Sequence, residues 1–209
     1  MIAPALQHRV LALANQVGPR ADLEGAPASL HRYRVRKSET VRDDLSSAPV
    51  LELVLEGRKT IWRDGNREIF RAGQLLLLPA GLPLDVTNEP CAESGVYRAM
   101  RLEFAPDAIA RFRANWPEAP ERLPGEAPLR VAVDGPLVES LGHALEALLQ
   151  PEHHGRLTAM NRLMEVLLRL RRQGKLADLI GDVAESEPAA ALPSRVAAAT
   201  ASWAAAPLP

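Results

Sequence analysis

Residues 50–86 read VLELVLEGRKTIWRDGNREIFRAGQLLLLPAGLPLDV, and this stretch decides the fold class. Its short apolar runs are separated by Gly, Pro, Asp and Asn, which is typical of β-strands joined by tight turns. The Asp-Gly-Asn tripeptide at 64–66 predicts a hairpin between strands at 59–63 and 67–71. Further strands are expected at 31–36, 50–55, 74–78, 83–87 and 96–104. Many short strands with turns between them favour a barrel or a sandwich.

One group of turn residues in this stretch has a specific spacing. Gly73, Pro79, Gly81 and Asn88 stand in the order Gly, five residues, Pro-x-Gly, six residues, Asn. The glycines and the proline suit a sharp corner between two strands of a small barrel. This part of the chain resembles the second sequence motif of the cupins. The resemblance implies a cupin-like double-stranded β-helix, also called a jelly-roll barrel, within an α+β protein.

The metal ligands of the cupin motifs are missing from the chain. The motif's inward-pointing histidine is Leu84 here, and the glutamate position of the first cupin motif is Val50. No histidine occurs between His31 and His143. A first-row metal site of this kind needs three inward ligands, so we expect no metal, no cofactor and no catalytic residue. A metal-dependent cupin enzyme, such as a dioxygenase or an isomerase, remains the alternative because fold alone does not fix function.

The part of the chain that follows the barrel is predicted to be helical. A helix that starts near Asp134 places leucines on one face, and a second helix covers about 157–170. The two stripes exceed what one barrel face needs, so we expect a homodimer formed through this segment. The dimerisation candidates on the second helix are Leu157, Met160, Leu163, Met164 and Leu167. Packing against the barrel of the same chain is the alternative reading of these stripes.

Three segments together resemble AraC/XylS-type transcription regulators. Residues 50–86 match the core hairpins of their sensing domain without a gap, and LEGAPASLHRYR at 23–34 resembles the start of that domain. LPSRVAAATASWAAAPLP at 192–209 resembles the first helix of their DNA-binding module. The resemblance implies an effector-sensing and dimerisation region, not an enzyme, that controls DNA binding by a C-terminal module. An effector-free dimerisation module is a further alternative.

The resemblance also divides the chain. It implies an N-terminal helix or arm at 1–24, an effector-binding barrel at 25–125 and a helical dimerisation segment at 126–185. A linker and the first helix of a truncated DNA-binding module are expected at 186–209. Promoter DNA would then be bound only through helix-turn-helix units absent from these residues. The formal net charge of −1 agrees, because non-specific DNA affinity needs a surplus of Lys and Arg.

The effector-binding candidates are taken from the same resemblance. They are Arg42, Leu84, Val86, Ala99 and Arg101. Two guanidinium groups beside an aliphatic wall would suit a small effector with a carboxylate or phosphate and an apolar tail. Simple alternation along 96–104 would instead turn Met100 and Leu102 toward a core and Arg101 outward, and a surface position for both arginines is the alternative. In residues 50–55, Glu52 is expected to face away from the core.

The single cysteine, Cys91, allows no internal disulfide and no cysteine metal cluster. No stretch of sequence is long and apolar enough to span a bilayer. We therefore expect a cytoplasmic location and no membrane partner.

Overall fold

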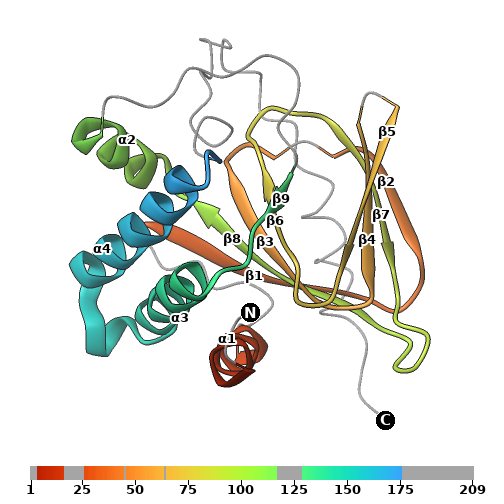
Figure 1. Cartoon of the computed structure of the whole chain (residues 1–209), viewed down its shortest axis with the longest axis horizontal. Coiled ribbons are helices and arrows are strands. Elements are labelled where there is room, and N and C mark those ends of the chain that lie inside the picture. Colours follow the sequence, from red (N-terminus) through yellow and green to blue (C-terminus); the bar gives the residue numbers. More distant parts are fainter. Residues whose placement is uncertain (1–3, 17–25, 45, 64, 117–128, 176–209) are drawn as a thin grey trace, which may run out of the picture.

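The computed structural model describes residues 4–16, 26–44, 46–63, 65–116 and 129–175. Two antiparallel sheets face each other, and the helices lie beside one of them (Figure 1). The expected linker and helix at 186–209 lie outside the described residues.

Within the described residues the two sheets together contain nine strands. The first sheet has the order β1-β8-β3-β6-β9, and the second has the order β2-β7-β4-β5. The strands are β1 (Ala28–Val35), β2 (Glu39–Asp44), β3 (Val50–Glu56), β4 (Arg58–Arg63), β5 (Asn66–Arg71), β6 (Leu75–Leu78), β7 (Leu84–Glu89), β8 (Tyr97–Phe104) and β9 (Arg130–Val131). From β1 to β4 and from β5 to β8 consecutive strands alternate between the two sheets, as in a jelly-roll barrel, whereas β4 and β5 form a hairpin within one sheet.

The predicted hairpin is confirmed, since β4 and β5 pair from Arg58↔Arg71 to Arg63↔Asn66. Gly65 has a φ of 78°, a backbone conformation that favours glycine. Two strands were not predicted. β2 has the polar sequence ETVRDD, without apolar alternation, and its pairing with β7 is interrupted by a bulge between Val41 and Asp44. β9 is only two residues long.

The five-stranded sheet is covered on both faces. On β3, Leu51 and Leu53 belong to one apolar core, whereas Val50 and Val54 belong to a second core between the two sheets. The first core includes the helices, and the second fills the barrel. β6 shows the same division, because its four consecutive leucines contribute alternately to the two cores. Burial of both faces explains why the sequence of this sheet shows little polar alternation.

Four helices pack around the first core: α1 (Pro4–Gln16), α2 (Pro106–Asn115), α3 (Gly135–Leu149) and α4 (Pro151–Arg172). The side chain of Asp134 caps α3 by accepting a hydrogen bond from the Leu137 backbone N–H at 2.8 Å, and the helix begins where the sequence predicted. Only a short turn separates α3 from α4. Helical structure resumes at Pro151, and only Gly155, at φ 67° and ψ 162°, breaks the helix.

Most of the predicted dimerisation residues are buried within their own chain. Met160, Leu163, Met164 and Leu167 belong to the core that includes α3, and Leu163 and Leu167 are 0% exposed. Leu157 differs, because 64% of its surface is exposed. The structure therefore supports the alternative reading for four of the five residues. Among the described residues, no helix combines the length and the apolar character that crossing a bilayer requires.

Candidate functional site

The space between the two sheets is lined mainly by apolar side chains. Leu84 and Val86 reach it from β7, and Ala99 reaches it from β8. The complete buried cluster is Val50, Val54, Ile61, Phe70, Leu76, Leu78, Leu84, Val86, Tyr97, Ala99 and Leu129. Three of the predicted effector-binding residues therefore share one interior.

A cluster of charged groups lies inside this barrel. The Glu52 carboxylate accepts hydrogen bonds from Lys59 Nζ at 2.6 and 2.7 Å and from the Tyr97 hydroxyl at 2.9 Å. Arg101 Nε lies 3.7 Å from the same carboxylate. Glu52 comes from β3, Tyr97 and Arg101 come from β8, and Lys59 comes from β4 of the other sheet. The ion pair therefore links the two sheets across the interior.

The expectation that Glu52 faces away from the core is wrong. Glu52 is 0% exposed and Lys59 is 4% exposed. Glu52 has the same strand parity as Val50 and Val54, which also point into the barrel. The outward face that the sequence suggested does not exist, because the helices cover the opposite side of β3. The sequence signal for this buried ion pair was an acid within an apolar run, followed by a lysine on the next strand.

Burial and pairing act in opposite directions on the two charges. Burial would raise the pKa of the Glu52 carboxyl, but Lys59, Arg101 and the hydrogen bonds from Lys59 and Tyr97 outweigh it, so this pKa is lowered. Burial lowers the pKa of the Lys59 ammonium, and Glu52 opposes that effect. Burial and the nearby Glu52 raise the pKa of the Tyr97 hydroxyl. Glu52 is therefore a carboxylate anion whose main cationic partner is Lys59, and the Tyr97 hydroxyl stays neutral and donates a hydrogen bond to it.

Arg101 is only partly satisfied in this cluster. Its side chain is 17% exposed, and Glu52 is the one acidic partner that the described residues provide, beyond hydrogen-bond distance. A guanidinium has five N–H donors in a rigid, planar arrangement. Arg101 therefore presents a mostly buried cation with donor capacity left over, beside an apolar interior.

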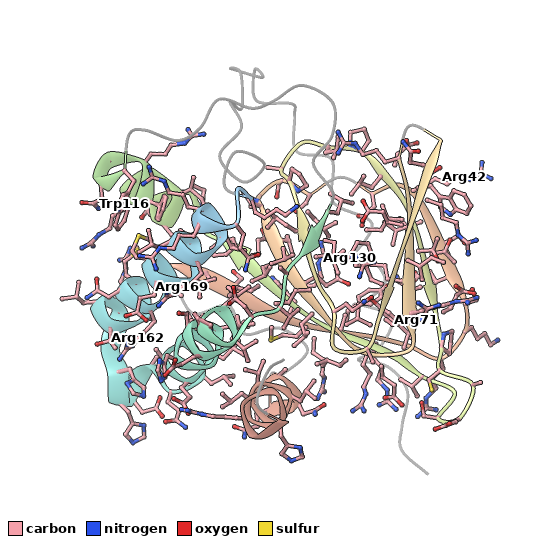
Figure 2. The ribbon with its side chains drawn as sticks, in the orientation of Figure 1. Arg42, Arg71, Trp116, Arg130, Arg162 and Arg169 are labelled. Carbon is pink, nitrogen blue, oxygen red and sulfur yellow. The ribbon has the colours of Figure 1, made fainter. Side chains whose placement is uncertain are left out.

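Arg42 does not join the other predicted residues. It lies on β2 at the bulge, and its side chain is exposed. Figure 2 shows it at the outer end of the second sheet, pointing away from the barrel. The structure therefore brings Leu84, Val86, Ala99 and Arg101 to one interior and leaves Arg42 outside it.

A further polar group inside the barrel was missed by sequence reasoning. Asn88 on β7 is 3% exposed, and its Oδ1 has no hydrogen-bond partner in the described part of the chain. In the sheet register Asn88 lies between Glu39 and Lys59. Glu39 in turn accepts a hydrogen bond from the Tyr33 hydroxyl. A buried acceptor without a donor is unfavourable, so this position suits a donor from water or from a ligand.

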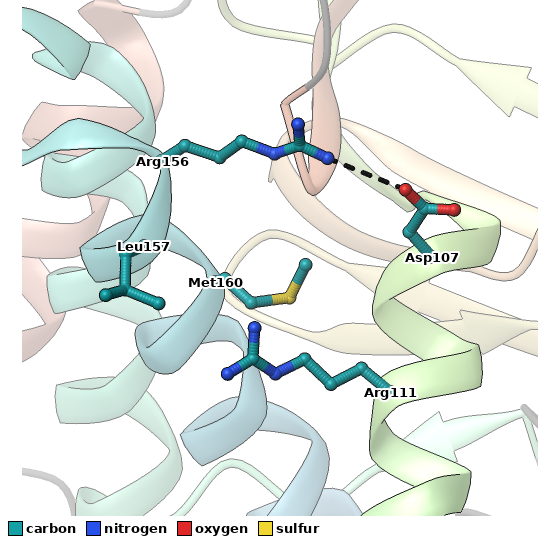
Figure 3. Close-up of a pocket in the computed structure, with 5 residues that line it drawn as sticks. All are labelled: Asp107, Arg111, Arg156, Leu157 and Met160. Carbon is teal, nitrogen blue, oxygen red and sulfur yellow. Dashed lines mark ion pairs between the residues drawn. The ribbon is translucent and has the colours of Figure 1, made fainter.

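A separate hollow lies outside the barrel, between α2 and α4 (Figure 3). Its volume is about 410 Å³, and Asp107, Arg111, Arg156, Leu157 and Met160 line it. Arg156 and Asp107 form an ion pair of 3.5 Å across it, and both side chains are largely exposed. The exposed Leu157 and two arginines give this surface a mixed apolar and basic character.

No cluster of three or more His, Cys, Asp or Glu side chains within the described ranges could hold a metal ion. The purified chain is accordingly expected to contain no stoichiometric Fe, Mn, Zn or Ni, because Leu84 and Val50 stand where cupin ligands would be. Elemental analysis by mass spectrometry after mild chelation measures this directly. One bound metal per chain would restore the cupin-enzyme alternative.

Comparison with known families gives one match, which covers most of the chain. The model described as "AraC-type transcriptional regulator N-terminus" matches residues 28–181. None of the curated proteins compared with the chain matches it in sequence.

Several solved structures resemble this one in fold. ToxT from Vibrio cholerae, in a P21 crystal form, is 8% identical with a TM-score of 0.56, over 75% of this chain and 61% of that one. ToxT from Vibrio cholerae O395, bound to (E)-4-(8-methylnaphthalen-1-yl)but-3-enoic acid, is 7% identical with a TM-score of 0.53, over 73% and 60%. A cupin 2 conserved barrel domain protein from Salinispora arenicola is 18% identical with a TM-score of 0.36, over 46% and 81%. The chain thus spans about three fifths of the ToxT chains.

Proposed function

Because the chain belongs to the AraC-type transcriptional regulators, through their N-terminal domain at residues 28–181, we propose that its barrel binds a small effector with one anionic group and an apolar part. Such a domain is the effector-sensing region of a regulator, and the proposal concerns what it senses and where. The site consists of Arg101 with the apolar wall that includes Leu84, Val86 and Ala99.

The observation that carries the proposal is the state of Arg101. A mostly buried guanidinium whose acidic neighbour lies at 3.7 Å retains donors for a further anion. Hydrogen bonds between a guanidinium and a carboxylate are charge-assisted and strong. The adjacent apolar side chains would hold the remainder of the ligand. Two ToxT structures contain bound acids with apolar bodies, an unsaturated fatty acid and a naphthalenyl-butenoic acid, which supports the same ligand chemistry here.

Decanoate is a suitable probe for this proposal. We expect it to bind to the purified chain and to raise its melting temperature, because a ligand that binds only the folded state stabilises it. Arg101→Met should weaken decanoate binding by about tenfold or more, the value of a hydrogen bond to a charged group. Isothermal titration calorimetry measures the affinity, and thermal denaturation measures the stabilisation.

Arg42→Met is the matched control, since it removes an exposed arginine outside the barrel. It should leave decanoate affinity unchanged. Equal affinities for the Arg101→Met and unmodified chains would disprove the site, and the absence of any carboxylate binding would favour an effector-free dimerisation module.

In this proposal the bound effector biases the arrangement of dimer and DNA-binding modules, which is a shift between pre-existing states. Homodimerisation and DNA binding through a C-terminal module are parts of the same proposal. The exposed Leu157 and the hollow beside it are the described surface that best fits a subunit contact.

A further inference from the structure

We infer that Glu52 restricts the barrel to ligands with a single negative charge, so that a carboxylate is accepted and a phosphate dianion is rejected. Glu52 achieves this by neutralising Lys59, which leaves Arg101 as the cation available to a ligand within the described part of the barrel. This inference rests on the proposed function and narrows its ligand class.

The first step concerns the two cations near the Glu52 carboxylate, Lys59 and Arg101, of which only Lys59 is hydrogen-bonded to it. Both oxygens of Glu52 accept hydrogen bonds from Lys59 Nζ, and one of them also accepts from Tyr97. Glu52 is therefore well satisfied without Arg101, which approaches it only to 3.7 Å. Because Lys59 is engaged by two short contacts and is almost completely buried, its charge is not available to a second anion.

The second step concerns the other charged groups of the barrel. His31 lies 3.6 Å from Glu103, and Arg130 donates to the Ile69 carbonyl oxygen at 2.6 Å and lies over the Phe70 ring. His31 therefore has an acidic neighbour. Arg130 has no acidic partner among the described residues, but it lies on β9, which β3 and β6 separate from β8, so it does not adjoin an anion held at Arg101. The remaining titratable groups that face Glu52 and Lys59 from neighbouring strands are Tyr33, Glu39, Asp44, Tyr97 and Arg101. Apart from Arg101 they are acids, which repel a second negative charge, and two phenols whose hydroxyls already donate to Glu52 and Glu39.

The third step concerns the residue that lies opposite Lys59 in the sheet. Asn88 lies opposite Lys59 in the sheet register and has a buried Oδ1 without a donor in the described residues. An acceptor oxygen at this place repels an anionic oxygen and favours a neutral donor. A ligand with one carboxylate at Arg101 therefore meets one cation that Glu52 does not neutralise, whereas the second charge of a dianion would be repelled by Glu52, whose carboxylate lies 3.7 Å from Arg101 Nε.

Decanoate and decyl phosphate, which share one alkyl chain, test the inference on the complete 209-residue chain. At pH 7.5 the phosphate is largely a dianion, since its second pKa is about 6. The unmodified chain should bind decanoate about tenfold more tightly than decyl phosphate, because like charges repel strongly where solvent is excluded. A preference of the unmodified chain for decyl phosphate would overturn the inference without any variant.

Two variants separate the role of Glu52 from that of the ion pair as a whole. Glu52→Gln leaves both Lys59 and Arg101 for the ligand, and should reverse the preference toward decyl phosphate. The double variant E52Q/K59M removes one charge of each sign, and should restore the preference for decanoate. Lys59→Met leaves Arg101 as the remaining cation beside Glu52, and should lower decanoate affinity about tenfold, since the carboxylate then competes for that guanidinium.

The outcomes distinguish this inference from the proposed function. If the unmodified chain binds neither probe, the proposed function fails and the inference fails with it. If decanoate binds but Glu52→Gln keeps the original preference, only the inference is overturned. Should Glu52→Gln not fold, the affinity of Lys59→Met for decanoate decides, and an unchanged affinity would refute the role assigned to Glu52. Should neither single variant fold, the unmodified chain decides, and equal or tighter binding of decyl phosphate than of decanoate would overturn the inference.

Discussion

Lys59→Met is expected to lower the free energy of unfolding by about 3–5 kcal/mol, because it removes the main partner of a fully buried carboxylate. Glu52→Gln should have a similar cost, since it leaves the Lys59 ammonium unpaired inside the barrel. The double variant E52Q/K59M should be much closer to the unmodified chain, because replacing both members of a buried ion pair is often nearly neutral. Urea denaturation followed by circular dichroism gives the three values.

The neighbouring residue provides a matched control for this prediction. Arg58 precedes Lys59 on β4 and pairs with Glu89, but its side chain is 46% exposed. Arg58→Met should therefore cost only a small fraction of the loss caused by Lys59→Met, since solvent screens exposed ion pairs. Equal costs for the two substitutions would show that the barrel interior is more hydrated than the structure indicates.

The positions of most strands could be predicted from local sequence. The hairpin at 64–66 and the corner formed by Gly73, Pro79 and Gly81 are turns whose residue types follow from backbone geometry. The cap at Asp134 was predictable for the same reason. β2 could not be predicted because its polar residues carry no apolar alternation, and its position depends on pairing with β7, more than forty residues away in sequence.

The site was harder to predict than the fold, for a physical reason. Alternation tells which residues of a strand share a face, but it does not tell which face is the interior when both are buried. On β8, Met100 and Leu102 face the helices while Tyr97 and Ala99 face the barrel, so Arg101 points inward despite the apolar residues on either side of it. Glu52 and Lys59 pair because their strands belong to two sheets that pack face to face. No local sequence pattern predicts which residues meet across that interior.

The dimerisation surface was hard to predict for a related reason. An apolar stripe shows that a helix packs against something, but it does not distinguish the core of its own chain from a partner. On α4 most of the stripe is used within the chain, and only Leu157 among the five candidates remains exposed. The two kinds of residue on this helix can be separated by experiment.

Leu163→Glu is expected to unfold the chain, and Leu157→Glu is expected to leave it folded. Leu163 is 0% exposed in the core between α3, α4 and the barrel, so the glutamate would place an unpaired charge in apolar surroundings and remove a well-packed side chain. Such a change should cost more than about 4–5 kcal/mol, which approaches the whole stability of a domain of this size. Leu157 projects at the hollow beside α2 (Figure 3), where a glutamate stays in water and should change stability by about 0.5 kcal/mol or less.

Circular dichroism and sedimentation velocity on the same two variants give the readout. If subunits meet at the surface that contains Leu157, then Leu157→Glu should yield a folded monomer, because a charge at the centre of an apolar contact opposes association. A Leu163→Glu chain that remained folded and became monomeric would instead show that the buried stripe of α4 is the subunit contact. The four buried candidates would then exchange their partners within the chain for partners in a second copy, and the helices would have to rearrange when the dimer forms.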